Sequence, residues 1–237
     1  MTAETDRWVT ESRTRLKEYN KKRQGYQPRA GRTMPDIDDL PIGGSRSFHL
    51  AVLSIDIRGF TSIALDLQDA RISNLAQLQA LYLSEMSEIV RAAGGATEKY
   101  TGDGVLGLFG TESETTSSAD VMNACKAALT VKLILKKSLN PYFEELGLPQ
   151  IGCGQGIDYG PVLMERVGAR GDNQFSLSGA TVSVAAKLQG IASVDQILIG
   201  GSVARRLPED WQKRLKPVEP PKGIKYETFD LNAVWAE

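Results

Sequence analysis

Apolar and β-branched residues dominate positions 48–57, the pattern of a strand buried on both faces. After the turn Gly59-Phe60-Thr61, apolar positions recur at helical spacing as far as Leu67 and again over residues 75–93. Gly94-Gly95 ends this stretch, because glycine is a poor helix former. The pattern predicts a central strand followed by two helices.

Two short apolar segments, residues 96–100 and 105–109, come next. Between them lies Gly102-Asp103-Gly104, which has the turn chemistry of a tight antiparallel hairpin. We therefore expect Asp103 at the tip of a hairpin.

Residues 117–137 carry apolar positions on one face and predict a second long amphipathic helix. Two paired strands are predicted at 151–159 and 161–167, split at Gly160-Pro161, with a polar loop at 168–174. The other expected elements are a strand at 175–177, a helix at 179–191, a strand at 197–199, a helical turn at 202–207 and a strand near 226–231. This order favours an α+β fold, a ferredoxin-like sandwich with a mainly antiparallel sheet and flanking helices.

The amino-terminal 47 residues differ from the rest of the chain. Residues 5–23 have a weak helical pattern with a basic end, and residues 25–47 are rich in Gly, Pro, Arg and Asp without periodicity. We expect a helix and extended arm over 1–47 and a catalytic domain over 48–237. The basic arm could bind nucleic acid or lipid, but a solvated or dimer-wrapping arm is favoured.

Composition narrows the class of protein. The 41% hydrophobic and 24% charged fractions of the 237 residues are typical of a soluble domain, and the net charge of -1 argues against a nucleic-acid binder. Cys125 and Cys153 lack metal-ligand spacing and are expected to be buried apolar residues. No segment is long and apolar enough for a membrane span, so we expect a cytoplasmic protein without an integral membrane segment.

Two aspartates stand where apolar strands give way to glycine turns. Asp56 closes the first strand and Asp103 the hairpin, and a carboxylate there costs several kcal/mol unless it is paired or binds a cation. Together with a carbonyl such as that of Ile57 they offer the oxygen ligands that Mg²⁺ or Mn²⁺ prefers. A strand-end aspartate can instead cap a helix or hold a turn. The lone histidine, His49, argues against Ser-His-Asp hydrolases and zinc enzymes.

Phosphate chemistry fits this arrangement. Two divalent ions can stabilise the attacking and leaving oxygens of a displacement at phosphorus. The backbone N–H groups of residues 58–61, which include Gly59, Phe60 and Thr61, would suit the β- and γ-phosphates.

Three segments, residues 54–63, 98–110 and 179–187, resemble the class III nucleotidyl cyclase catalytic domain, with a likeness that spans residues 48–231. The resemblance implies a head-to-tail homodimer with active sites shared between subunits. It also implies that Asp56 and Asp103 bind two divalent cations, and that the 3′-hydroxyl of a nucleoside triphosphate attacks the α-phosphorus and releases pyrophosphate.

The base-reading positions depart from the family pattern. Lys99 resembles the adenine-reading lysine of adenylate cyclases, but the partner aspartate is Ser176 here. A serine hydroxyl donates or accepts, whereas a lysine only donates and so prefers a ring nitrogen or a carbonyl oxygen. Uracil offers two carbonyls, which favours UTP over CTP.

The transition-state positions also depart from the family. The usual asparagine and arginine are Ser183 and Lys187, and lysine supplies a point charge in place of a bidentate fork. Arg170 could substitute, although a solvated loop arginine is the simpler interpretation. Lys222, in a Lys-Gly segment like the one that borders the triphosphate site, is a weaker candidate for phosphate contact.

These departures resemble the bacterial pyrimidine cyclases of Pycsar antiphage systems, which make cyclic UMP or cyclic CMP to activate a separate effector. An adenylate cyclase, indicated by Lys99, is one alternative. A degenerate nucleotide-binding dimer, indicated by Ser183 and Lys187, is another, and a pure protein-interaction module fits the two aspartates least well.

Overall fold

The computed structural model describes residues 29–30, 40–67, 72–110, 118–169 and 172–232. Contacts divide the chain into two compact units, a smaller one with residues up to Phe48 and Val162–Ser178, and a larger one with the remainder. Strands β2 (Ser45–Ile57) and β5 (Cys153–Ala169) begin in one unit and end in the other.

The strands of the larger unit follow the order β3-β4-β2-β5-β7-β9-β8. Most neighbours are antiparallel, and β5 and β7 are parallel. The other strands are β3 (Ala96–Thr101), β4 (Gly104–Phe109), β7 (Ile197–Gly200), β8 (Lys216–Val218) and β9 (Thr228–Asp230). The sheet is mixed and mainly antiparallel, as predicted.

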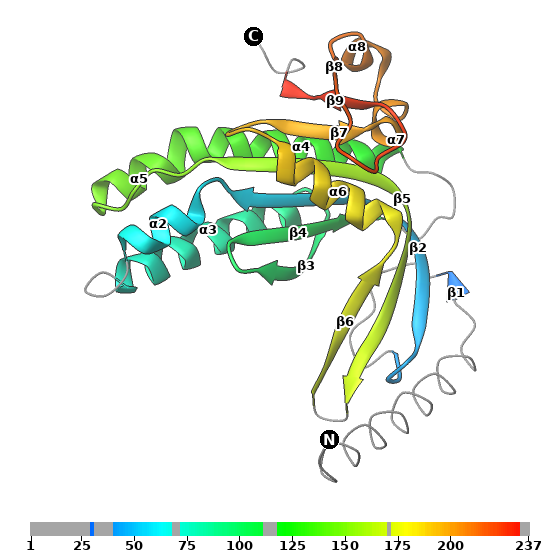
Figure 1. The fold of residues 1–237 in the computed structure, drawn as a ribbon, viewed down its shortest axis with the longest axis horizontal. Coiled ribbons are helices and arrows are strands. Elements are labelled where there is room, and N and C mark those ends of the chain that lie inside the picture. Colours follow the sequence, from blue (N-terminus) through cyan, green and yellow to red (C-terminus); the bar gives the residue numbers. More distant parts are fainter. Residues whose placement is uncertain (1–28, 31–39, 68–71, 111–117, 170–171, 233–237) are drawn as a thin grey trace, which may run out of the picture. The chain divides into compact units, whose positions relative to one another are not determined.

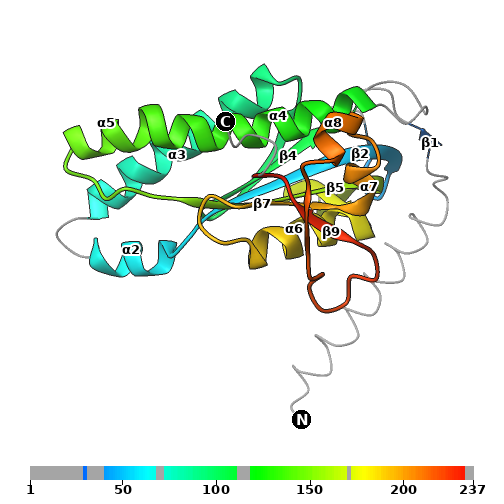
Figure 2. The ribbon, with the colours of Figure 1, turned by 90° about the horizontal axis from the view of Figure 1, so that it is seen from above.

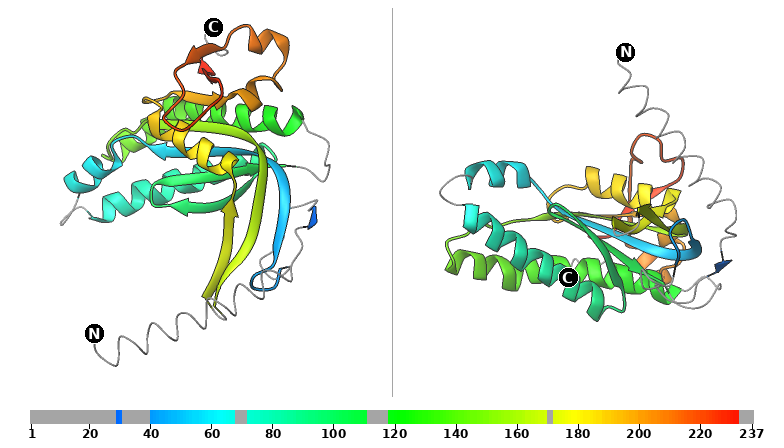
Figure 3. Two further views of the ribbon diagram at one scale, coloured as in Figure 1. Left: turned by 45° about the vertical axis from the view of Figure 1, so that its right-hand side comes forward. Right: turned by 90° about the horizontal axis from the view of Figure 1, so that it is seen from below.

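Helices flank this sheet on both sides (Figures 1 and 2). On one side lie α3 (Ile72–Ala92), α4 (Ser118–Ile134), the π-helical turn η3 (Leu135–Leu139) and α5 (Asn140–Glu145). The other side carries α2 (Phe60–Asp66) and α6 (Ala180–Ile191), a division that Figure 3 also shows. Two short helices, α7 (Gly201–Ala204) and α8 (Glu209–Gln212), follow β7. These layers confirm the predicted α+β sandwich.

The core of the larger unit lies mainly between the sheet and α3 and α4. Successive β2 residues Ala51, Val52 and Leu53 are fully buried, because helices cover both faces of this central strand. The buried residues of α3, among them Leu78 and Tyr82, recur every three or four positions and so form one face. Burying each such large side chain contributes about 1.5–3 kcal/mol.

In the smaller unit, the end of β5 pairs with β6 (Asp172–Ser178) as an antiparallel hairpin. The start of β2 pairs with β1 (Arg29–Ala30), which is parallel to it. Arg166 of β5 secures the hairpin and the chain before β2, because its guanidinium donates to Asn173 Oδ1 at 2.7 Å and to Leu40 O at 2.8 Å.

The predicted strand break at Gly160-Pro161 is wrong, because β5 continues from Cys153 to Ala169. Proline at 161 lacks an N–H donor and would break most central strands. Here it lies between the stretch of β5 that pairs with β7, which ends at Ile157, and the stretch that pairs with β6, which starts at Leu163. Pro161 is paired in neither of these two registers, so its missing N–H removes no hydrogen bond from them.

Other predictions also need correction. The expected loop over 168–174 is mostly strand, since β6 begins at Asp172, and the expected arm already contains the start of β2 at Ser45. The sequence pattern missed α5, α8 and β8. The predicted helix over 5–23 lies outside the described residues. No helix in the described part of the chain has the length and apolar character to cross a membrane.

Candidate active site

The structure brings the two strand-end aspartates together. Asp56 lies in register with Gly104 of β4, so Asp103, one residue earlier in the hairpin turn, is its neighbour. The turn requires Gly102, whose φ of 71° lies in the left-handed region. The two carboxyl groups are close enough for Asp103 to act on the pKa of Asp56. The strand-and-hairpin pattern therefore located this pair correctly.

Asp56 and Asp103 are two acidic side chains that lie close together, and both are half-buried. Burial, the charge of Asp103 and the hydrogen bond to it raise the pKa of Asp56 to about 6. Arg58 and a hydrogen bond from Gln189 Nε2 to Asp56 Oδ2, at 3.2 Å, act in the opposite direction without cancelling the shift. A divalent cation would offset the repulsion between the two carboxylates. Their oxygen atoms are therefore suitable ligands for the predicted Mg²⁺ or Mn²⁺. Among the described residues no group of three or more His, Cys, Asp or Glu side chains could hold a metal ion.

Helix α3 holds the hairpin that carries Asp103. Gln79 Nε2 donates to the carbonyl of Gly102 at 2.7 Å, and Ser87 Oγ lies 2.9 Å from the hydroxyl of Tyr100. Gln79 and Gln189 could not be predicted from the sequence, since each contacts an element far away in the sequence.

A buried tyrosine and cysteine lie beside the pair. The Sγ of Cys153 is 3.5 Å from the Tyr82 hydroxyl. Burial raises the pKa of Tyr82, and Cys153 and the charges of Asp56 and Asp103 add to this effect. Burial raises the pKa of Cys153 and of Cys125 to about 12, so both remain thiols. The expectation of two buried, unpaired cysteines is confirmed, and His49 is exposed.

The turn after β2 is more constrained than expected. The amide of Arg58 donates to Gly152 O at 2.8 Å, so it is not free for a phosphate, which corrects the predicted set. Gly59, with a φ of 71°, precedes α2, and a Cβ placed on it would meet nothing within 4 Å. Phe60 and Thr61 open α2 beside this open space.

Helix α6 presents different residues on opposite faces. On one face the Gln189 side chain contacts Asp56, and the Gln189 carbonyl accepts from the Arg58 guanidinium, which lies over Gly154. Two helical positions apart correspond to about 200°, so Lys187 points the other way. Its ammonium lies near Gly223, where a Cβ would be 3.1 Å from Nζ. Within one chain, Lys187 therefore points away from Asp56.

Lys222 lies at an exposed corner next to this ammonium. The amide of Ile224 donates to Pro221 O at 3.0 Å, and Gly223 has a φ of 91°, as the third residue of a type II turn requires. The structure thus brings Lys187 and the Lys222 turn together. Ser183 lies exposed one helical turn before Lys187, with its Oγ 3.5 Å from Gly179 O.

The remaining predicted residues are placed as follows. Ile57 ends β2 as a buried residue, and Lys99 belongs to β3. Ser176 is half-buried in β6 of the smaller unit, opposite Glu165. Arg170 lies outside the described residues.

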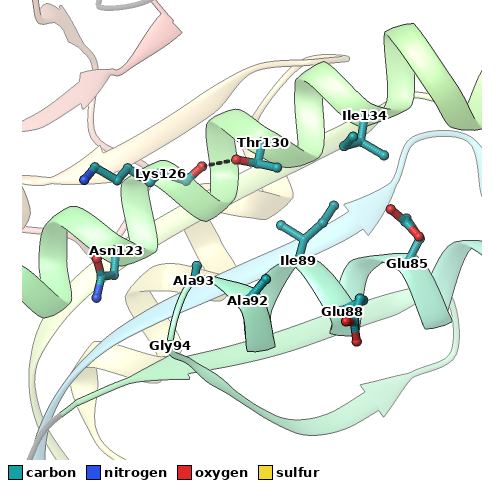
Figure 4. Close-up of a pocket in the computed structure, with 10 residues that line it drawn as sticks. All are labelled: Glu85, Glu88, Ile89, Ala92, Ala93, Gly94, Asn123, Lys126, Thr130 and Ile134. Atoms are coloured by element: carbon teal, nitrogen blue, oxygen red, sulfur yellow. Dashed lines mark hydrogen bonds between the residues drawn. The ribbon is translucent and has the colours of Figure 1, made fainter.

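A groove of about 710 Å³ lies elsewhere in the larger unit, between α3 and α4 (Figure 4). Glu85, Glu88 and Ile89 line it from α3, and Asn123 and Lys126 from α4. It contains none of the predicted site residues.

Comparison with known proteins gives a consistent result. The family described as "Adenylate and Guanylate cyclase catalytic domain" matches residues 45–230. An adenylate cyclase of Anabaena cylindrica is 30% identical over 190 residues, which cover 76% of the chain and 35% of that protein. A uridylate cyclase of Gulbenkiania mobilis is 30% identical over 207 residues, which cover 83% of the chain and 76% of that protein. The chain thus spans about a third of the first relative's length and three quarters of the second's.

The crystal structure of the adenylyl cyclase CyaB from P. aeruginosa has the same fold. The TM-score is 0.68 at 23% identity, with 78% of this chain and 94% of that one covered.

Proposed function

Because the chain belongs to the adenylate and guanylate cyclase catalytic domain family, we propose that it is a metal-dependent cyclase acting on a pyrimidine nucleoside triphosphate, UTP in preference to CTP. The products are the 3′,5′-cyclic monophosphate and pyrophosphate. The adjacency of Asp56 and Asp103, set by the pairing of Asp56 with Gly104, is the observation that carries this proposal. A protein that only bound partners would have no need for two carboxyl groups held together at half-buried strand ends.

Asp56, Asp103 and the carbonyl of Ile57 would hold two divalent cations, Mg²⁺ or Mn²⁺. When bound, these ions lower the pKa of the substrate 3′-hydroxyl and offset charge on the α-phosphate. Besides Asp103, the Asp56 carboxylate has the neutral amide of Gln189 as a hydrogen-bond donor and the charge of Arg58 nearby, and the Arg58 guanidinium donates to the Gln189 carbonyl.

The triphosphate would lie between the turn and the lysines. The amides of Gly59, Phe60 and Thr61 lie at the start of α2, close in sequence to Asp56, and a Cβ on Gly59 would meet nothing within 4 Å. Lys187 and Lys222 would supply positive charge to the phosphates, and Ser183 a hydroxyl, with Arg170 a further candidate. The 3′-hydroxyl gives up its proton to solvent, its oxygen forms a bond to the α-phosphorus as the bond to the bridging oxygen breaks, and pyrophosphate leaves with that electron pair.

The opposite faces of α6 support a shared site. Since Lys187 points away from Asp56 in the same chain, one substrate can touch both only if two copies contribute. A head-to-tail homodimer, in which one subunit gives the aspartates and the other gives Ser183, Lys187 and Lys222, meets this requirement.

We assign selection of the nucleobase to Lys99 and Ser176. A donor-only lysine and a serine that can donate match the two carbonyls of uracil, and the uridylate cyclase of Gulbenkiania mobilis is a relative over most of both chains. An equally similar adenylate cyclase makes cyclic AMP synthesis the second candidate.

Incubation of the purified chain with Mn²⁺ and each of the four nucleoside triphosphates tests the proposal. We expect cyclic UMP as the main product, cyclic CMP as a minor one, and one pyrophosphate per turnover. Cyclic AMP as the main product would overturn the pyrimidine assignment. Nucleotide binding without pyrophosphate release from any substrate would identify a degenerate binding dimer.

The biological role extends this proposal. The cyclic pyrimidine nucleotide would act in the cytoplasm as a second messenger for a separate effector protein, in antiphage defence. We assign catalysis to residues 48–237 and propose that residues 1–47 are an amino-terminal helix and arm, whose last residues begin β2 at Ser45.

A further inference from the structure

A buried acid in the larger unit is not used by the proposed chemistry. Asp158 of β5 is only 3% exposed. The Ser202 hydroxyl donates to its Oδ1 at 2.5 Å, and the Tyr226 hydroxyl donates to its Oδ2 at 2.7 Å. A buried carboxylate destabilises the folded state unless hydrogen-bond donors satisfy it. Ser202 and Tyr226 supply such donors to Asp158.

The two donors come from different places. Ser202 belongs to α7, which continues directly from β7. Tyr226 belongs to the segment between β8 and β9, residues 219–227, which extends toward α6 (Figure 2). Burial and the Asp158 carboxylate raise the pKa of Tyr226, so its hydroxyl stays protonated and can donate. The contact therefore ties this segment to the centre of the sheet.

The same segment carries the Lys222 turn. Ile224, 8% exposed, packs with Val184 and Leu188 of α6, and Gly223 lies under the Lys187 ammonium. Two contacts therefore hold the segment between β8 and β9: the apolar packing of Ile224 and the hydrogen bond of Tyr226 to Asp158. The hydrogen bond of Tyr226 fixes the part of the chain that follows the Lys222 turn.

We propose that Asp158 and Tyr226 are positioning residues that hold the Lys222 turn against Lys187, where the two lysines bind the triphosphate. This inference rests on the proposed function. Neither residue touches substrate, and both act through the backbone of residues 219–226. The sheet does not depend on this bond, because β9 pairs with β7 from Thr228 to Asp230 and the amide of Gly201 donates to Glu227 O at 2.8 Å.

The test is Tyr226→Phe, with Tyr142→Phe as the matched control. Phenylalanine keeps the ring, which lies close to Gly200, where a Cβ would be 3.2 Å from a ring carbon, and removes only the hydroxyl. Tyr142 is an exposed tyrosine on α5, remote in sequence from the turn. We expect Tyr226→Phe to raise the KM for the triphosphate about five-fold, the effect of one lost hydrogen bond, with kcat changed less than two-fold. Tyr142→Phe should change neither.

Amide hydrogen exchange supplies a readout that needs no activity. Residues 219–226 should exchange faster in Tyr226→Phe, while α5 and β9 keep the exchange rates of the unmodified protein. Unchanged exchange overturns the anchor even if the chain has no cyclase activity. Faster exchange with an unchanged KM overturns the positioning role while leaving the cyclase proposal intact. If the unmodified protein releases no pyrophosphate from any triphosphate, the proposed function fails, and with it the positioning role.

Discussion

Asp56 and Asp103 place two acids together at strand ends, where the charge of Asp103 adds to burial in making ionisation of Asp56 less favourable. Because the pKa of Asp56 is raised from 3.8 to about 6, the folded state binds this proton more tightly than the unfolded chain does. The free energy of unfolding of the metal-free protein therefore falls as pH rises through that window. The same repulsion makes the pair receptive to divalent cations.

We predict that Asp56→Asn abolishes turnover and stabilises the metal-free protein at neutral pH. A shift of two pKa units corresponds to about 3 kcal/mol, which solvent screening at this half-exposed site reduces to about 1 kcal/mol. Urea unfolding in a chelator, at pH 4 and at pH 7.5, measures the effect, and the gain should be present only at the higher pH.

Asp210→Asn, at an exposed position on α8, is the control and should leave the free energy of unfolding unchanged at both pH values. Added Mn²⁺ should stabilise the unmodified protein more than Asp56→Asn, because a ligand stabilises the state that binds it. Equal stabilisation of both proteins by Mn²⁺ would count against Asp56 as a ligand.

The aspartate pair was predictable because its geometry is local. A central strand followed by a glycine turn, and a hairpin with Asp103 at its tip, are patterns of a few adjacent residues. Gln189 could not be found this way, since it lies 133 positions from Asp56 and sits on a helix whose sequence contains no sign of the contact. The Tyr226 bond to Asp158, across 68 positions, escaped for the same reason.

At the scale of elements, α3 acts as the support for the β3–β4 hairpin. Its inward face packs in the core, while Gln79 holds the turn carbonyl of Gly102 and Ser87 lies beside Tyr100. A two-stranded hairpin is marginally stable by itself, so the position of Asp103 depends on these contacts as well as on pairing with β2. The helix therefore supports the proposed metal site without supplying a ligand.

Gln79→Ala should weaken metal use. We expect the Mn²⁺ concentration for half-maximal activity to rise about five-fold, as one hydrogen bond of about 1 kcal/mol implies, with activity restored at saturating Mn²⁺. Gln77→Ala, an exposed position on the same helix, is the matched control. A lower activity at saturating Mn²⁺ with an unchanged half-maximal concentration would assign Gln79 to another role.

Elements with strong periodicity were predicted well, and those set by pairing partners were not. The long α3 helix follows from its apolar spacing. Strand β5 was split at Gly160-Pro161 because a proline usually interrupts a ladder. In the structure Pro161 lies between the residues that pair with β7 and those that pair with β6, which the sequence does not reveal. Strand β8, three residues long and largely exposed, has no apolar run that could reveal it.

For the whole molecule, the question is how many chains make one active site. The two faces of α6 separate Lys187 from Asp56 within a chain, so the proposed dimer should complement defects across subunits. Asp56→Ala and Lys187→Ala should each be inactive alone. In a heterodimer of the two variants, one site carries both changes and the other carries neither.

Mixing equal amounts of the two inactive variants under conditions of subunit exchange should therefore restore about a quarter of the activity of the unmodified protein, since half of the dimers are mixed and each has one intact site. Exchange is verified with differently tagged chains recovered together. A mixture of Asp56→Ala with Asp103→Ala is the control, because both changes affect the contribution of one subunit and no intact site can form. Proven exchange without recovery in the first mixture would mean that Asp56 and Lys187 act from the same chain, or that Lys187 is not required, and would contradict the shared site.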